Sequence, residues 1–305
     1  MRTASTLRVG YATDPGLERG INEDRLLVDE AHGLFLVVDG LGGHVAGDKA
    51  AETAVRAIGE RMAANEGDEK ESIRRAITEA NNRIYELAES NEQWSGMACV
   101  LTLAVLKAET VTVGHVGDTR LYLIWNGNLR KVTSDHSPVG EQEDQGKLTE
   151  EEAMSHPRRN QVFRDVGSRR RKADEPGFVE IKQLPFRPEA ALLLCSDGLS
   201  DVLTSSEISD IVEQYDGDSD AIARQLVQAA NDAGGKDNVS VVFVAGPGFL
   251  GGQSNTLSEA RPRHAVTRTR KTFSWRGVIF AVFWLIIGMA LGILAWIELG
   301  RLKIR

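Results

Sequence analysis

The stretch Leu34-Phe35-Leu36-Val37-Val38-Asp39-Gly40 decides the fold, because five apolar residues run directly into an aspartate and a glycine. An apolar run of this length, bounded by a turn-forming pair, predicts a β-strand. Such a strand delivers the Asp39 carboxylate to the rim of a sheet. Carboxylates gathered at one rim can hold a hard divalent cation in oxygen ligands, so the position of Asp39 indicates a metal site.

Three more aspartates occupy the same kind of position at the border of an apolar run. They are Asp118 after Val111–Val116, Asp197 after Leu192–Ser196, and Asp237 before Val239–Val244. A single Asp-Gly pair is more often a turn than a ligand. Four such aspartates favour metal ligands over turns, because several strands can bring together acids that lie far apart in the sequence.

The order of the elements predicts an α+β fold. Strands come consecutively and helices come in pairs, without the alternation of a parallel sheet. The expected strands are 7–12, 25–29, 34–38, 99–106, 111–116, 121–125, 178–184, 190–195 and 239–244, and the expected helices are 46–64, 69–90, 206–215 and 219–233. We expect an antiparallel β-sandwich flanked by helix pairs on both faces, which gives four layers in the order αββα.

Two segments between these elements have recognisable turn or loop chemistry. Asn126-Gly127-Asn128 is typical of a hairpin turn. Residues 141–175 are polar and charge-dense, and they predict a surface flap with a short helix at 149–154.

Composition and charge narrow the classes of protein. With 42% apolar and 26% charged residues, the chain is typical of a globular protein. Cys99 and Cys195 each lie inside an apolar run, which indicates buried, reduced thiols.

The net charge of the chain is −8. Nine basic and two acidic residues give 247–305 a charge of +7, which leaves 1–246 at −15. A domain this acidic is a poor nucleic-acid binder, so we expect no nucleic-acid partner.

The C-terminal end predicts a membrane span. Gly277–Ile297 is uncharged, mostly apolar and long enough to cross the hydrocarbon layer, with Trp275 and Trp296 at its ends. We therefore expect a folded domain over 1–246, a flexible basic linker over 247–275, a transmembrane helix over 276–298 and a short tail over 299–305. Six basic residues precede the span and three follow it. That asymmetry predicts a single-pass protein of the inner (cytoplasmic) membrane with its folded domain in the cytoplasm.

Five ordered segments resemble the metal-dependent protein phosphatases, the type 2C serine/threonine phosphatases, in their bacterial form. The segments are Arg19 with Asn22-Glu23-Asp24, Val38–His44, Val116–Arg120, Cys195–Leu199 and Gly235–Asn238. One such match would be weak, whereas the set in order across roughly residues 7–246 is specific.

The resemblance implies a ligand set for two cations. Asp39, Asp197 and Asp237 resemble the ligands of one cation. Asp39 also resembles the bridge to a second cation, which the Gly40 carbonyl and an acid from Glu23-Asp24 complete. Oxygen ligands of this kind suit Mn²⁺ or Mg²⁺ rather than zinc.

Three further residues acquire roles from the resemblance. Asp118 resembles the acid that holds a third, weaker cation in bacterial members, and Arg19 resembles the phosphate-binding arginine. His44 is the candidate general acid for the leaving oxygen. Many eukaryotic relatives place a histidine directly after Asp-Gly, whereas Leu41 stands there in this chain, so a structural or helix-capping role for His44 stays open.

The resemblance also implies a reaction and its partners. It implies hydrolysis of phosphoserine and phosphothreonine on proteins by a water activated at a binuclear Mn/Mg centre, without a phosphoenzyme. Phosphorylated proteins would be the substrates and Ser/Thr kinases the opponents. The alternative is a catalytically inactive, membrane-attached module that binds phosphoproteins. Loss of a metal acid would mark such a module, and every expected acid is present.

Several other motifs have simpler interpretations. A cysteine-based phosphatase is excluded because acids, and no arginine, follow Cys195. His115 and His136 are expected to satisfy hydrogen bonds at strand ends. The run Arg169–Lys172 is either a solvated basic stretch or a docking patch for acidic or phosphorylated partners. Residues 216–220 predict the start of a helix rather than a calcium loop.

Overall fold

Strand β3 (Leu34–Leu41) explains why this chain folds in layers. In the computed structural model, Leu36 and Val38 pack in a core beneath helices, whereas Phe35 and Val37 pack in a second core between two sheets. Successive side chains of a strand point to opposite faces. A strand that is covered on both faces therefore needs an unbroken apolar run, which is what this segment supplies.

The structure describes residues 7–42, 45–64 and 67–252, all within one compact unit. His44 lies outside these residues, as do most of the predicted linker and all of the predicted transmembrane helix and tail. Within the described ranges, no helix is both long and apolar enough to cross a membrane.

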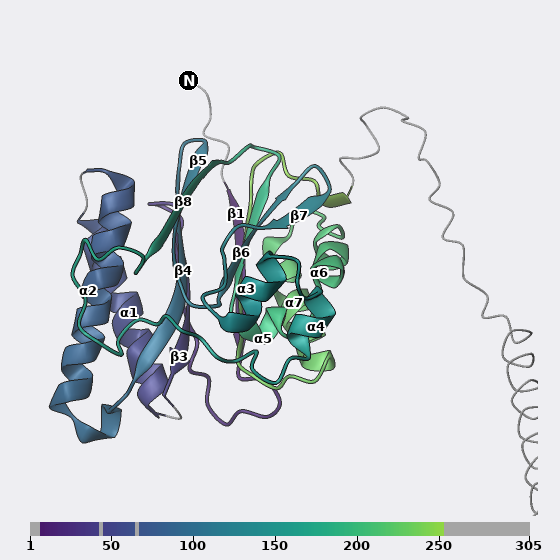
Figure 1. Cartoon of the computed structure of the whole chain (residues 1–305). Helices are drawn as coiled ribbons and strands as arrows, with labels where there is room; N and C mark the ends of the chain where they lie inside the picture. The colour runs from purple at the N-terminus through teal and green to yellow at the C-terminus, as the bar shows by residue number, and fades with distance from the viewer. Residues whose placement is uncertain (1–6, 43–44, 65–66, 253–305) are drawn as a thin grey trace, which may run out of the picture. The chain divides into compact units, whose positions relative to one another are not determined.

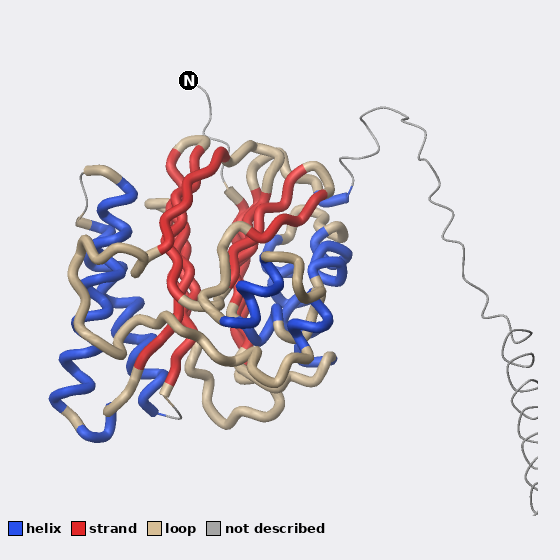
Figure 2. Tube along the Cα trace, viewed as in Figure 1, coloured by secondary structure: helices blue, strands red, loops and turns tan. Residues whose placement is uncertain are grey.

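Ten strands form two antiparallel sheets in the described part of the chain. One sheet has the order β1-β10-β9-β6-β7 and the other β2-β3-β4-β5-β8. The remaining bounds are β1 (Arg8–Asp14), β2 (Arg25–Asp29), β4 (Ala98–Lys107), β5 (Thr110–Val116), β6 (Arg120–Trp125), β7 (Asn128–Lys131), β8 (Glu180–Pro185), β9 (Ala191–Cys195) and β10 (Val239–Ala245). Figure 2 shows the two sheets in red, packed face to face.

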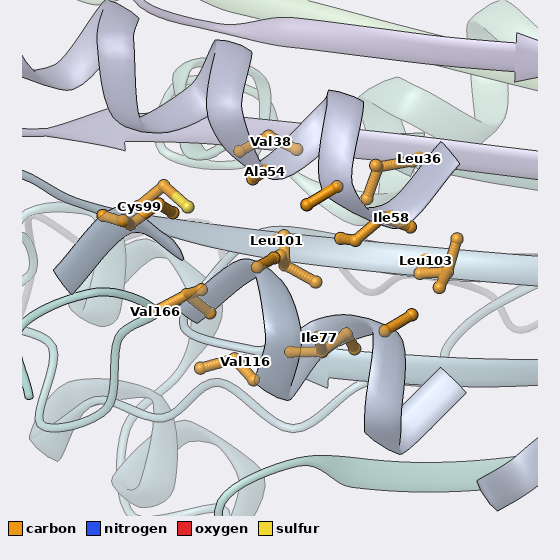
Figure 3. Packing of buried hydrophobic residues seen from close by; sticks show 14 of the residues in the cluster. Leu36, Val38, Ala54, Ile58, Ile77, Cys99, Leu101, Leu103, Val116 and Val166 are labelled. Carbon is orange, nitrogen blue, oxygen red and sulfur yellow. The ribbon is translucent and has the colours of Figure 1, made fainter. Parts of the chain in front are cut away.

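Helices cover both outer faces of this sandwich. Figure 1 places α1 (Val45–Ala63) and α2 (Glu69–Ser90) against the β3 sheet, and α6 (Ser205–Val212) and α7 (Ser219–Asp232) against the other. Figure 3 shows the first of these contacts, where Ile58 and Ile77 lie over Leu36 and Leu101. The predicted α+β sandwich with helix pairs on both faces is confirmed.

Several local features that the sequence predicts are present in the structure. Asn126 and Gly127 have φ angles of 52° and 70°, as a two-residue hairpin turn requires. Both cysteines are free and buried. In the flap, α4 (Glu150–Met154) begins at a capping box between Thr149 and Glu152.

Two short helices were not predicted. One is α3 (Pro138–Asp144), which begins where the Ser137 hydroxyl accepts the Gly140 N–H at 2.9 Å. The other is α5 (Asp197–Ser200), where the expected strand-end turn continues into one helical turn. A 3₁₀ turn, η1 (Glu92–Trp94), links α2 to β4.

Candidate metal centre and active site

The strand pairing brings the predicted acids of the β3 sheet to one end of the sandwich. Strand β2 runs antiparallel to β3, and Arg25 pairs with Val38. Glu23 and Asp24, which precede Arg25, therefore lie beside Asp39, which follows Val38.

The second sheet presents its acids at the same end. Cys195 at the end of β9 pairs with Val241 on one side and Arg120 on the other. Asp197 follows β9, Asp237 precedes β10 and Asp118 precedes β6. Three chain segments therefore bring one acid each to the rim where β9 ends.

The electrostatics of Asp39 show that these acids converge. Its pKa is raised well above the ordinary value by burial and by the negative charges of Asp197, Asp24, Asp118 and Asp237. Like charges raise a carboxyl pKa only when they lie close together in a poorly solvated place. The four aspartates that the sequence singled out thus form one cluster with Asp24.

The pKa values of other carboxyl groups in the cluster are raised as well. Burial raises the pKa of Asp24 to about 6, although the Ser196 and Ser240 hydroxyls nearby lower it in part. Neither carboxylate oxygen of Asp24 has a hydrogen-bond partner of normal geometry within the described residues. Burial, together with Asp135 and Asp201, raises the pKa of Asp118 to about 7. A cation would relieve this crowding directly.

Asp201 belongs to the cluster, although the sequence analysis did not identify it. Burial raises its pKa to about 6, and its charge raises that of Asp197. Asp201 caps the C-terminal end of α5, where its N–H donates to Asp197 O at 2.7 Å. The spacing of four residues from Asp197 was the available signal, since residues four apart share a helix face.

Arg159 of the flap partly compensates Asp201, with Nε 3.2 Å from Oδ2. Both residues line a small hollow of about 20 Å³ together with Asp118 and Asp197. The flap therefore borders the acidic cluster.

Gly40 and Glu23 face each other across the first turn of α1. A Cβ built on Gly47 would fall 2.5 Å from Glu23 Oε1 and 2.8 Å from the Gly40 carbonyl oxygen. No side chain can occupy that space without moving one of these oxygens. Gly47 was not identified from the sequence, although a glycine inside a helix costs about 1 kcal/mol relative to alanine and is itself a signal.

Arg19 lies at the rim of the cluster. Its Nη2 donates to Asp237 Oδ2 at 2.7 Å, while 48% of the Arg19 side chain stays exposed. Burial opposes the charge on the guanidinium, but the carboxylates of Asp237, Glu23 and Asp197 together outweigh it, so the pKa of Arg19 is raised. The Arg19 guanidinium is therefore oriented by Asp237 and is still exposed enough to bind an anion from solvent.

Asn238 fixes the segment that carries Arg19, a role the sequence analysis missed. Its Nδ2 donates to the carbonyls of Pro15 and Ile21 at 3.0 Å each, and its Oδ1 accepts the Glu23 N–H at 2.8 Å. Both faces of one buried amide therefore hold the two ends of the loop in place. The amide group is needed because it both donates and accepts.

The oxygen-only donor set fits a hard divalent cation. The cluster offers carboxylates and the Gly40 carbonyl, with no nitrogen or sulfur ligand among the described residues that compose it. Such a cation would neutralise the crowded charges of Asp39 and Asp197 and the buried carboxylate of Asp24.

A second polar cluster, of His115, His136 and Glu180, has a structural role. His115 contacts Thr102 Oγ1 through Nδ1 at 2.9 Å and the Ser134 carbonyl through Nε2 at 3.2 Å. His136 Nδ1 accepts the Gly117 N–H at 3.0 Å. Burial lowers the pKa of His115 to about 4 and that of His136 to about 3, so both rings are neutral near pH 7. The predicted role in strand-end hydrogen bonds is confirmed.

Three of the four basic side chains in the flap run Arg169–Lys172 pair with neighbouring acids. Arg169 and Arg171 both lie 2.6 Å from Glu175 Oε1, and Arg170 lies 3.0 Å from Glu86. Arg171 also covers the Phe178 ring at 4.5 Å. These contacts favour a structural role for the three arginines over a docking patch.

Arg120 anchors the flap from beneath. It is buried and contacts Asp135 at 2.6 Å and Glu143 at 2.8 Å. Because Glu143 belongs to α3, the ion pairs connect the flap to the sheet next to Asp118. A buried charge pair of this kind is costly to break.

Comparisons with known proteins agree with this architecture. Residues 19–240 match the family model for protein phosphatase 2C. A serine/threonine phosphatase stp from Listeria welshimeri is 38% identical over 242 residues, which cover 77% of this chain and 94% of the relative. The protein phosphatase PhpP from Streptococcus pneumoniae is 32% identical over 246 residues, 78% of this chain and 97% of the relative.

Solved structures give the same result. The Mycobacterium tuberculosis serine/threonine phosphatase PstP/Ppp superposes with a TM-score of 0.70 at 30% identity, covering 79% of this chain and 98% of that one. A catalytic domain of PstP in complex with two manganese ions superposes with a TM-score of 0.68 at 29% identity, covering 79% and 99%. The chain therefore belongs to the protein phosphatase 2C family and is a metal-dependent serine/threonine phosphatase of that type.

Proposed function

We propose that this chain hydrolyses phosphoserine and phosphothreonine on proteins at two divalent cations, with a third bound more weakly. The observation that carries the proposal is the mutual crowding of Asp39, Asp197 and Asp24 at the same rim as Arg19. Buried acids of one sign and an exposed arginine beside them provide, respectively, a place for cations and a place for a phosphoryl group.

The residues divide into those that hold cations and one that holds phosphate. Asp39, Asp197 and Asp237 would hold one cation. Asp39, the Gly40 carbonyl and Glu23 or Asp24 would hold the second, and Asp118 the weaker third. When bound, Mn²⁺ or Mg²⁺ supplies an activated water and neutralises charge on the phosphoryl group.

Arg19 would bind the phosphoryl oxygens through its exposed guanidinium edge. Asp237 keeps that guanidinium oriented, and Asn238 fixes the loop on which it stands, so little reorganisation is needed when substrate arrives. His44 is the proposed proton donor to the leaving serine or threonine oxygen, although it lies outside the described residues.

We further propose that the protein acts at the inner membrane on targets of Ser/Thr kinases. The support is the apolar run 277–297 with its basic flank, and the family resemblance. Fractionation of cells that express the full chain tests the anchor. The wild type is expected in the carbonate-washed membrane, and Ile287→Arg should weaken this association whereas Ile304→Arg should not. Release of the wild type by carbonate would contradict the anchor.

Phosphate release from a phosphothreonine peptide tests the reaction. The full chain should release phosphate with Mn²⁺ and stop when EDTA is added. Binding of the phosphopeptide without any turnover in Mn²⁺ would instead favour the inactive binding module.

A further inference from the structure

The loop that carries Arg19 exposes two large apolar side chains, one on each side of the arginine. Leu17 is 70% exposed and Ile21 is 43% exposed. Across the described residues only six large hydrophobic side chains are exposed: Tyr11, Leu17, Ile21, Trp125, Phe163 and Leu250. Two of the six therefore stand within two residues of the proposed phosphate-binding group.

This loop is held rigidly despite its exposure. The N–H groups of Leu17 and Glu18 both donate to the Gly235 carbonyl, at 2.6 and 3.2 Å. The Gly16 N–H donates to Asp14 Oδ1 at 2.9 Å, and Asn238 holds the Pro15 and Ile21 carbonyls. The Leu17 side chain lies beside Gly235, yet most of its surface and a large part of that of Ile21 stay exposed.

Exposed apolar side chains on a rigid backbone are inexpensive to bury against a partner, because little conformational freedom remains to be lost. They flank Arg19, which is fixed by Asp237 at the edge of the acidic cluster. Because Leu17 and Ile21 each stand two positions from Arg19, residues that flank a phosphate bound at Arg19 come within reach of this loop. The domain carries −15, so acidic neighbours in that peptide would be repelled rather than bound.

We propose that Leu17 and Ile21 are specificity-determining residues that favour phosphopeptides with apolar residues next to the phosphorylated serine or threonine. This inference rests on the proposed phosphatase function and names a substrate class for it. Small aryl phosphates, which have no flanking residues, would not use the contact.

The test compares three substrates with full-length protein in Mn²⁺. They are an aryl phosphate, a phosphothreonine peptide with leucines on both sides, and the same peptide with serines. The wild type should show a kcat/KM about fivefold to tenfold higher for the leucine peptide than for the serine peptide, as expected from burial of part of two apolar side chains.

The double variant Leu17→Ser/Ile21→Ser should lose that preference and keep the wild-type rate on the aryl phosphate. Leu250→Ser is the matched control, an exposed leucine beyond the opposite end of β10, and it should keep the preference. An unchanged melting temperature in the double variant excludes a folding effect.

Three results would overturn the inference. They are equal rates of the wild type on the two peptides, a preference that survives the double substitution, or a parallel loss on the aryl phosphate. If the double variant instead loses binding to anionic phospholipid vesicles and keeps the peptide preference, the loop contacts a membrane surface and not the substrate. A wild type that hydrolyses none of the three substrates would refute the phosphatase proposal itself.

Discussion

Arg19 Nη2 lies 2.7 Å from Asp237 Oδ2, an ion pair between residues 218 positions apart in the sequence. The pair joins the group proposed to bind phosphate to a group proposed to bind metal. Because half of the arginine side chain is exposed, the ion pair itself adds little to stability. The ion pair instead orients the Arg19 guanidinium, and so it sets the direction from which the guanidinium can bind a phosphoryl group.

Arg19→Ala should therefore impair catalysis without unfolding the protein. The loss of a charge-assisted contact to phosphate is expected to lower kcat/KM on a phosphothreonine peptide by about 10- to 100-fold. Arg158→Ala, which removes an exposed arginine that contacts Gln161, is the control and should leave the rate unchanged. Equal rates for the Arg19 variant and the wild type would show that Arg19 does not bind the phosphoryl group.

Asn238 offers a test of how the loop is held. Asn238→Asp keeps the shape of the side chain but cannot donate to the Pro15 and Ile21 carbonyls, and it adds a charge beside Asp237. We expect the free energy of unfolding to fall by about 2–3 kcal/mol, the usual cost of leaving buried polar groups unsatisfied. Urea unfolding measures this, and a stability within 0.5 kcal/mol of wild type, roughly the scale of a neutral surface change, would contradict the role.

Gly47 and Gly59 form a matched pair in helix α1. Alanine at Gly59 meets only Leu27 Cδ2 at 3.4 Å, so Gly59→Ala should stabilise the protein by up to about 1 kcal/mol. Gly47→Ala places a methyl group against Glu23 Oε1 and the Gly40 carbonyl, so it should weaken Mn²⁺ binding by roughly tenfold or more. Calorimetric titration with Mn²⁺ compares the two variants, and equal affinities would show that the space over Gly47 does not matter.

His115 should make the protein sensitive to acid. Burial lowers its pKa to about 4, against an ordinary value of about 6.5. Between these values the unfolded chain binds a proton that the folded chain does not, so stability is full above pH 6.5 and falls as the pH drops toward 4. Relative to His115→Asn, the wild type should lose on the order of 3 kcal/mol between pH 7 and pH 4. A constant difference between the two unfolding free energies across this range would contradict it.

The acids at strand ends could be predicted because their signal is local. An apolar run that stops at Asp39 or Asp197 identifies both the strand and the group at its rim. The roles of Gly47 and Asn238 could not be predicted in this way, because they depend on the approach of segments that lie far apart in the sequence. Helix α3 was missed although Ser137-Pro138 is a typical helix start. The single turn of α5, with Gly198 inside it, carries too weak a helix propensity to recognise.

Calorimetric titration of Mn²⁺ into the metal-free full-length protein measures whether Asp39 and the neighbouring acids hold cations. The wild type should bind at least two ions per chain, and Asp39→Asn should lose both tight sites together, since Asp39 is shared between them. Binding of Mn²⁺ by the Asp39→Asn protein with wild-type stoichiometry and affinity would show that Asp39 is not a ligand shared by the two sites.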